Sequence, residues 1–280
     1  MKKITRRSFL AAAGLTAAAL ALTACGGSSS STASSAASST AASSEAASSS
    51  AAAAEVTTVE AGKLTMATNA AFPPYEMTTD AGDFEGIDVE TAQAIAEKLG
   101  LELQIDDMDF DAALLSVQQG KADIVMAGVT VTDERKAVMD FSDSYATGIQ
   151  SIIVPEGSDI ASPDDLAGKK IGTQRGTTGY IYCSDDFGDE NVVAYDDGLT
   201  AVQALNNGQV DAVVIDNAPA QEFVAANPGL VILDTSYAEE DYAIGMAKGS
   251  SLEDAINAAL EELKADGTLQ SIVDKYISAE

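Results

Sequence analysis

Arg135 and Asp216 are the residues of this 280-residue chain whose positions point most clearly to binding chemistry. Arg135 follows an apolar run that ends at Ala127, and Thr132 between them is suited to cap a helix. A guanidinium beside the free N–H groups of a helix start can hold a carboxylate with two hydrogen bonds. Asp216 ends a second apolar run, and its carboxylate could hold an ammonium group. The alternatives are a surface ion pair for Arg135 and a cap of the following helix for Asp216.

The composition removes several kinds of active site. The chain has no histidine, so it lacks the commonest general base, the commonest zinc ligand and any Ser-His or Cys-His pair. Asp107, Asp109 and Asp111 imitate the start of a calcium loop, but Ala112 and Gln118 stand where that loop needs Gly and Glu. No phosphate-binding loop, dinucleotide glycine pattern or nucleophile elbow occurs in the sequence. We therefore predict no catalytic residue, no metal site and no cofactor.

The first 25 residues predict export and a lipid anchor. Four Lys and Arg residues within the first seven precede an apolar run that is too short for a membrane span, which is typical of a signal peptide over residues 1–24. The run ends in Leu-Thr-Ala-Cys, a lipobox, so Cys25 is the predicted lipidation site. Arg6 and Arg7 leave both general and twin-arginine export open. We expect the mature protein outside the cytoplasm, anchored to the outer face of the cell membrane.

The segment after Cys25 predicts a disordered tether. Residues 26–54 are almost wholly Ser, Ala, Thr and Gly, which offer nothing large and apolar to bury, so we assign residues 25–62 to the lipidated cysteine and its tether.

Without the signal peptide the formal net charge moves from −29 to −33, which argues against nucleic acid as a partner. With Cys25 lipidated, Cys183 has no partner for an intrachain disulfide, and we predict a buried small hydrophobe rather than a reactive thiol.

From residue 63 onward the pattern predicts two α/β lobes. Each lobe alternates apolar strand runs with helical periodicity, an order typical of a mostly parallel sheet. An echo supports the repeat, because Leu-x4-Gly-x2-Asp-x-Val at residues 115–125 returns as Gln-x4-Gly-x2-Asp-x-Val at residues 203–213, although chance could produce it. The predicted strands are 64–68, 101–105, 124–127, 149–154, 170–174, 192–195, 210–215 and 242–247, and the predicted helices are 89–99, 110–119, 178–183, 199–206, 252–264 and 269–277.

Two of these strands, 149–154 and 242–247, are predicted to cross between the lobes as a hinge. The first lobe would then comprise residues 63–151 and 243–280, and the second lobe residues 152–242. Ligands of such sheets bind beyond the carboxyl ends of the strands, so the predicted site is the cleft between the lobes.

Short motifs along the two lobes are recognisable as a set. They are Ala-Thr-Asn-Ala-Ala-Phe-Pro-Pro-Tyr-Glu at 67–76, Gly-Ile-Asp-Val at 86–89, Phe-Asp at 110–111, Thr-Asp-Glu-Arg at 132–135, Phe-Ser-Asp at 141–143, and Gly-Thr to Lys-Tyr at 267–276. In this order they closely resemble the polar amino acid substrate-binding lipoproteins of ABC importers, solute-binding protein family 3. The resemblance implies a two-lobed, type II periplasmic-binding-protein-like fold with a two-strand hinge, which closes on a free amino acid.

The resemblance also implies a function and its partners. We expect an extracellular, lipid-anchored and monomeric receptor that binds a free polar amino acid and delivers it to the permease of an ABC importer, without catalysis. Two alternative functions are compatible with the same fold, namely a carboxylate-based lyase or dehydratase and a sensory ligand-binding protein. The missing histidine argues against the enzyme.

Carried over by position, the resemblance assigns roles in ligand binding. Arg135 would hold the α-carboxylate of the ligand, with help from Thr130 and Thr178, and Asp216 would hold its α-ammonium group. The remaining predicted contacts are Asn69, Phe72, Phe110, Gly128 and Gln174, with Arg175 as the alternative to Gln174.

The nature of the ligand side chain depends on the other positions. Phe72 and Phe110 match the aromatic walls of the family's pocket. Asn69 stands where members that take basic amino acids often carry a carboxylate, and Ala127 where many carry a serine. Both departures favour a neutral polar amino acid as the ligand.

Overall fold

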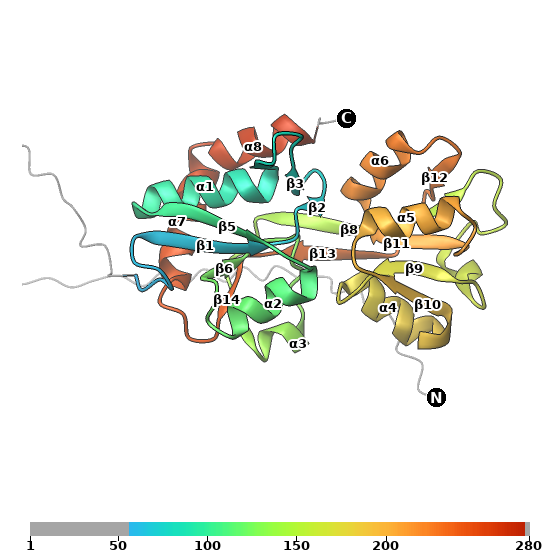
Figure 1. Cartoon of the computed structure of the whole chain (residues 1–280), viewed down its shortest axis with the longest axis horizontal. Coiled ribbons are helices and arrows are strands. Elements are labelled where there is room, and N and C mark those ends of the chain that lie inside the picture. The colour runs from blue at the N-terminus through green and yellow to red at the C-terminus, as the bar shows by residue number, and fades with distance from the viewer. Residues whose placement is uncertain (1–55, 278–280) are drawn as a thin grey trace, which may run out of the picture. The chain divides into compact units, whose positions relative to one another are not determined.

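The structure is a computed structural model, and it describes residues 56–277 (Figure 1). The predicted signal peptide, Cys25 and all of the tether before residue 56 lie outside these residues. The described part falls within one compact unit, Ser50–Glu280. Between residues 56 and 277, no helix has both the length and the apolar character needed to cross a membrane.

The first lobe is built on a mixed five-stranded sheet in the order β5-β1-β6-β14-β7. β1 is parallel to β5 and β6, whereas β14 is antiparallel to β6 and β7. The strands are β1 (Lys63–Thr68), β5 (Glu102–Asp107), β6 (Ile124–Val125), β7 (Met139–Phe141) and β14 (Gly245–Ala247). The helices are α1 (Ile87–Leu99), α2 (Phe110–Gln118), α3 (Asp133–Lys136), α7 (Glu253–Ala265) and α8 (Thr268–Tyr276), and a small antiparallel sheet contains β2 (Ala71–Phe72), β3 (Glu76–Thr78) and β4 (Phe84–Glu85).

Alternating side chains of this sheet pack against helices on its two faces. Met66 and Ile124 belong to the core that contains the apolar residues of α1, α7 and α8, whereas Ala67 and Val125 pack with those of α2. Figure 1 shows α1 and α8 on one side of the sheet and α2 on the other. Because successive side chains of a strand point to opposite faces, a continuous apolar run is what a sheet covered on both faces requires.

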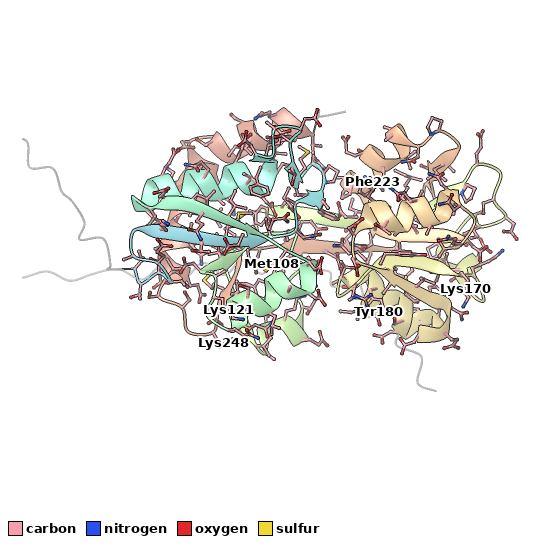
Figure 2. All side chains as sticks on the ribbon, viewed as in Figure 1. Met108, Lys121, Lys170, Tyr180, Phe223 and Lys248 are labelled. Atoms are coloured by element: carbon pink, nitrogen blue, oxygen red, sulfur yellow. The ribbon has the colours of Figure 1, made fainter. Side chains whose placement is uncertain are left out.

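The second lobe has the sheet order β10-β9-β11-β8-β12, and β13 also pairs with β8. Cys183 of α4 lies in the core on one face, so the prediction that this thiol is buried is confirmed. Figure 2 shows Tyr180 of α4 and Phe223 of α6 on opposite sides of this sheet. The elements are β8 (Ala146–Pro155), β9 (Ile171–Gln174), β10 (Val192–Tyr195), β11 (Ala212–Asp216), β12 (Leu230–Ile232), β13 (Ala238–Tyr242), α4 (Thr178–Phe187), α5 (Gly198–Asn206), α6 (Asn217–Ala226) and the 3-10 turns Pro163–Leu166 and Asp189–Asn191.

The sequence echo between the lobes corresponds to a repeated structure. The turns after α2 and α5 each contain a glycine with positive φ, 66° in the first lobe and 67° in the second. Asp123 then accepts a hydrogen bond of 2.7 Å from the N–H of Thr65 in β1, and Asp211 accepts one of 2.8 Å from the N–H of Lys170, just before β9. In both lobes the aspartate therefore ties its own strand to the start of the neighbouring parallel strand.

The predicted strand over residues 242–247 is wrong as a single strand. The chain leaves the second sheet at Tyr242, the last residue of β13, and joins the first sheet only at Gly245 in β14. Between them the N–H of Ala243 donates to the carbonyl of Val129, and the carbonyl of Ile244 accepts from Ser142. The interruption arises because the chain changes sheets here. In Figure 1, β13 and its partner β8 run between the two lobes. The lobe boundaries drawn at residues 151 and 242 stay a prediction, and β8 enters the second sheet from Ala146.

Candidate functional site

A cavity lies between the two lobes, at the carboxyl ends of β1, β6, β9 and β11. We call it the interlobe cavity. It contains every residue that the sequence analysis predicted as a ligand contact, from both lobes, and their roles in binding remain a prediction. Its lining consists of Asn69, Phe72, Glu76, Phe110, Ala127, Gly128, Thr130, Arg135, Gln150, Gln174, Thr177, Thr178, Val214, Ile215, Asp216 and Tyr242.

Arg135 is positioned in this cavity by the short helix α3. The hydroxyl of Thr132 accepts a hydrogen bond of 3.1 Å from the N–H of Arg135, so the predicted helix cap is confirmed. The guanidinium is buried and donates to the carbonyls of Thr130 at 2.8 Å and of Gly176, in the other lobe, at 3.2 Å. It also lies over the ring of Phe110, 5.4 Å from its centroid. Burial lowers the pKa of Arg135, but a guanidinium keeps its charge at neutral pH, and the alternative of a surface ion pair is wrong.

Asp216 fills one of the two roles that the sequence left open, that of a helix cap, and it also lines the interlobe cavity. As the N-cap of α6, its Oδ1 accepts a hydrogen bond of 3.1 Å from the N–H of Ala218, which confirms the helix cap. Its Oδ2 accepts one of 2.7 Å from the N–H of Ile149 in β8. Asp216 is only 2% exposed and lines the interlobe cavity, and burial raises the pKa of its carboxyl group to about 6. These backbone bonds fix the carboxylate in place and leave lone pairs for a cation.

Gln174, and not Arg175, faces the cavity. The Gln174 side chain is buried, and its Nε2 donates a hydrogen bond of 2.8 Å to Oδ1 of Asn69 in the other lobe. Asn69 is held in turn by a bond of 3.0 Å from its Nδ2 to the carbonyl of Met108. Arg175 points outward, with half of its side chain exposed (52%), toward Asp196. The amides of Gln174 and Asn69 therefore form one polar wall of the cavity.

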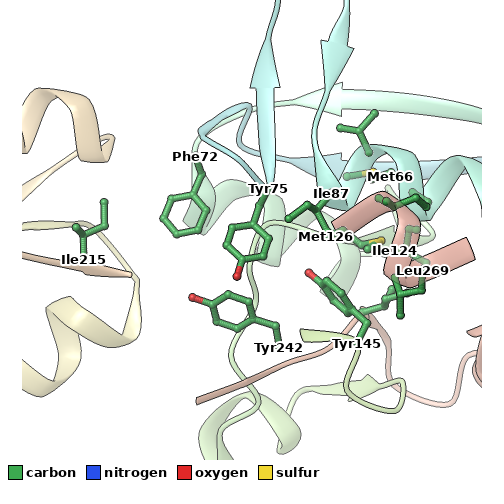
Figure 3. Packing of buried hydrophobic residues seen from close by; sticks show 14 of the residues in the cluster. Met66, Phe72, Tyr75, Ile87, Ile124, Met126, Tyr145, Ile215, Tyr242 and Leu269 are labelled. Atoms are coloured by element: carbon green, nitrogen blue, oxygen red, sulfur yellow. The ribbon is translucent and has the colours of Figure 1, made fainter. Parts of the chain in front are cut away.

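Aromatic rings form an apolar part of the lining (Figure 3). Phe72 stacks on Tyr75 with ring centroids 5.8 Å apart, and Tyr75 meets Tyr242 edge-on at 5.4 Å. Gly128 supports this arrangement, because its φ is +54° and a Cβ there would lie 2.9 Å from Cε1 of Phe72. Figure 3 shows Phe72 facing Ile215 of the second lobe.

A pair of buried acids, Glu76 and Asp88, lies beside the cavity, and neither was predicted from the sequence as a site residue. Both are fully buried; Glu76 lines the cavity, and within the described residues neither of its oxygens has a hydrogen-bond partner. Asp88 accepts a bond of 3.0 Å from the N–H of Gly128. Burial, together with nearby Asp88, raises the pKa of Glu76 well above its usual range, and burial raises the pKa of Asp88 to about 6. Burial therefore disfavours the ionised form of Glu76 in the folded protein.

Glu240 of β13 is a further acid that sequence reasoning missed. Its Oε2 accepts hydrogen bonds of 3.0 Å from each of three groups, the hydroxyls of Thr130 and Thr178 and the amide of Gln150. Its Oε1 is buried and has no hydrogen-bond partner in the part of the chain that the structure describes. The run Glu239-Glu240-Asp241 reads as a solvated acidic segment, and only the alternation of the strand, which was not predicted, turns the middle residue inward.

The charges of the cavity suit a small ligand with both an anionic and a cationic group. Arg135 of the first lobe supplies a buried positive charge, and Asp216 of the second lobe supplies a buried carboxylate. Within residues 56–277, no group of three or more His, Cys, Asp or Glu side chains is arranged to hold a metal ion.

Residues 64–279 match the family of bacterial extracellular solute-binding proteins, family 3. The L-cystine-binding protein TcyJ of Escherichia coli K12 is 33% identical over 226 residues, which are 79% of this chain and 85% of that protein. The arginine-, lysine-, histidine-binding protein ArtJ of Geobacillus stearothermophilus is 34% identical, with a TM-score of 0.75 over 78% of this chain and 96% of that one. An ancestral arginine-binding protein bound to glutamine is 42% identical, with a TM-score of 0.74 over 78% and 99%. Each of these relatives is named for the amino acids that it binds.

Proposed function

The chain belongs to the bacterial extracellular solute-binding proteins, family 3, and from this premise we propose that it binds a free polar amino acid in the interlobe cavity and delivers it to an ABC importer. The observation that carries the proposal is the burial of Arg135 and Asp216, from different lobes, in one cavity. A buried charge without a partner is costly, so the cavity favours a ligand that brings the complementary charges.

In this proposal the backbone part of the amino acid lies between the two charges. Arg135 binds the α-carboxylate, and the hydroxyls of Thr130 and Thr178, which line the same cavity, add hydrogen bonds. Asp216, fixed by two backbone N–H groups, binds the α-ammonium group. Because these groups come from both lobes, the ligand stabilises the form in which the lobes are together.

The ligand side chain lies between the amide wall and the rings. Asn69 and Gln174 offer neutral hydrogen-bonding groups, and Phe72, Phe110 and Gly128 bound the remaining space. This lining supports a polar amino acid. The relatives' names give the set to test, namely cystine, arginine, lysine, histidine and glutamine.

The proposal extends to where the protein acts. The lipobox at Cys25 and the Ser/Ala-rich segment after it support a receptor tethered to the outer face of the membrane, where it acts as a monomer that hands its ligand to a permease. No catalytic step is proposed, because the chain lacks histidine and its relatives are binding proteins.

The test is the thermal unfolding temperature of the purified protein in the presence of each common amino acid and cystine. A ligand at 100 times its Kd stabilises the folded state by about 2.7 kcal/mol, which shifts the transition clearly. A shift with one or a few polar amino acids supports the proposal. The absence of a shift with all of them, for protein that is folded and free of co-purified ligand, contradicts it.

A further inference from the structure

Glu240 holds the two hydroxyl groups that the proposed function assigns to the ligand. The side chain is buried, and its Oε2 lies 3.0 Å from Oγ1 of Thr130 and 3.0 Å from Oγ1 of Thr178. Thr130 belongs to the first lobe and Thr178 begins α4 of the second lobe, and their hydroxyls are 3.4 Å apart. A carboxylate of the protein itself therefore already bridges the lobes at the place proposed for the ligand's α-carboxylate.

The hydroxyls of Thr130 and Thr178 cannot donate to Glu240 and to a ligand carboxylate at the same time. A threonine hydroxyl has one O–H, so it donates one hydrogen bond at a time. The hydroxyls of Thr130 and Thr178 both face Oε2 of Glu240. The carboxylates of Glu240 and of the ligand are both acceptors, so neither can supply the proton for a hydrogen bond to the other. A ligand carboxylate gains these two donors only if Glu240 gives them up.

Charge adds to this competition. Arg135 is the only Lys or Arg among the residues that line the interlobe cavity. It already donates to two backbone carbonyls, and among residues 56–277 it makes no ion pair within 4.0 Å. A second carboxylate brought next to Glu240 in a buried site is repelled more strongly than it would be in water.

We propose that Glu240 is an internal competitor for the α-carboxylate position and thereby lowers the affinity for amino acids. The inference deepens the proposed function and rests on it. In the free protein Glu240 takes the hydroxyls of Thr130 and Thr178; on binding, the ligand's carboxylate takes them and Glu240 is left with the amide of Gln150. Glu240 is thus a specificity-determining residue. It selects against ligands whose carboxylate does not offset the two threonine hydrogen bonds that Glu240 loses.

The experiment compares Glu240→Gln with Glu239→Gln, which removes the same charge from the neighbouring, exposed side chain of the same strand. Each variant is titrated calorimetrically with L-glutamine and L-arginine, and with the α-amide of each, which lacks the carboxylate charge. Glu240→Gln should bind the amino acid about tenfold more tightly than wild type, and the gain for the α-amide should be clearly smaller. Glu239→Gln should match wild type for both.

Two results would overturn the inference. One is weaker binding of the amino acid by Glu240→Gln, and the other is an equal change, including none, for the amino acid and its α-amide. If wild type binds neither amino acid nor any other in the thermal panel, the proposed function itself fails, so the two failures are distinguishable. Circular dichroism checks that Glu240→Gln is folded, and Glu240→Ala provides a second variant that is read in the same way.

Discussion

The side-chain amide of Gln174 donates a hydrogen bond of 2.8 Å to Oδ1 of Asn69, and this bond joins the two lobes across the interlobe cavity. Both groups are neutral, and both are held by backbone as well, Gln174 through the carbonyl of Asp196 and Asn69 through the carbonyl of Met108. A ligand side chain that enters this part of the cavity therefore meets fixed amide dipoles instead of a charge. This wall should decide between neutral and cationic amino acids.

Replacement of Asn69 by Asp is expected to shift the preference toward arginine. The new carboxylate keeps the acceptor for Gln174 and adds a negative charge in a buried wall, where a guanidinium or ammonium is its best partner. We expect the ratio of arginine to glutamine affinity to rise by about tenfold or more. Calorimetric titration measures it, with Asn207→Asp in an exposed turn as the control. An unchanged ratio would show that the ligand side chain does not reach this wall.

Amino acid binding should weaken in acid because of Asp216. Burial raises the pKa of this carboxyl to about 6, and only its ionised form attracts an ammonium group. Affinity should therefore be full near pH 7.5 and fall by about tenfold near pH 5, one unit below that pKa. Titration at both pH values measures the change in affinity. Asp216→Asn should bind only weakly, and its affinity should change much less between the two pH values. Equal or tighter binding by wild type at the lower pH would contradict the assignment.

The stability of the free protein should fall as the pH rises from about 4 to about 7. Burial raises the pKa values of Glu76 and Asp88, so the folded state binds protons more tightly than the unfolded chain does. Their contribution is fully present below the unfolded pKa values and is lost as the pH rises through the folded ones, about 6 for Asp88. Urea denaturation across this range measures the free energy of unfolding.

Glu76→Gln should flatten this pH dependence, because the amide carries no titrating proton. The matched control is Glu85→Gln, since Glu85 is exposed on the neighbouring strand of the same small sheet and should leave the slope unchanged. A slope that is identical in Glu76→Gln and wild type would mean that another group titrates.

Gly128→Ala should impair binding through the ring of Phe72. The substitution places a Cβ 2.9 Å from Cε1 of Phe72 and forces a non-glycine residue to adopt a φ of +54°. Gly120→Ala is the control, because Gly120 has a φ of +66° with nothing within 4 Å of the added Cβ. Both variants should lose about 1–2 kcal/mol of stability from the backbone, but only Gly128→Ala should also weaken binding. Equal affinities of the two variants would refute a role for Phe72 as a wall of the site.

Local patterns were enough to predict most of the long elements, although the ten-residue helix α6 was not among the predicted helices. The helix over 89–99 with its stop at Gly100 is confirmed as α1, whose C-cap Gly100 has a φ of 69°, and the strand over 64–68 is confirmed as β1. The short strands β2, β3, β4 and β7 were not predicted, because two or three residues show no periodicity. Their position depends on neighbours that are distant in the chain.

In the candidate site, too, some residues could be predicted from local sequence and others could not. Asp216 is the last residue of β11, and Thr130 and Arg135 follow the end of β6. The sequence marks both strand ends, and the structure brings these residues into one cavity. Gln150 and Glu240 lie within strands β8 and β13, and their inward orientation follows from a register that pairs Gln150 with Ala238 and Gly148 with Glu240. Such long-range pairing is not visible in the local pattern.

The most direct test of the account is the calorimetric titration of wild type, Arg135→Ala and Arg175→Ala with the amino acid that gives the largest thermal shift. Arg135 is buried in the interlobe cavity, whereas Arg175 is exposed outside it, so the two variants remove the same group from inside and outside the site. We predict a loss of affinity of about 100-fold or more for Arg135→Ala and wild-type affinity for Arg175→Ala. Wild-type affinity in a folded Arg135→Ala protein would contradict the central claim that the ligand's carboxylate is bound by Arg135 between the lobes.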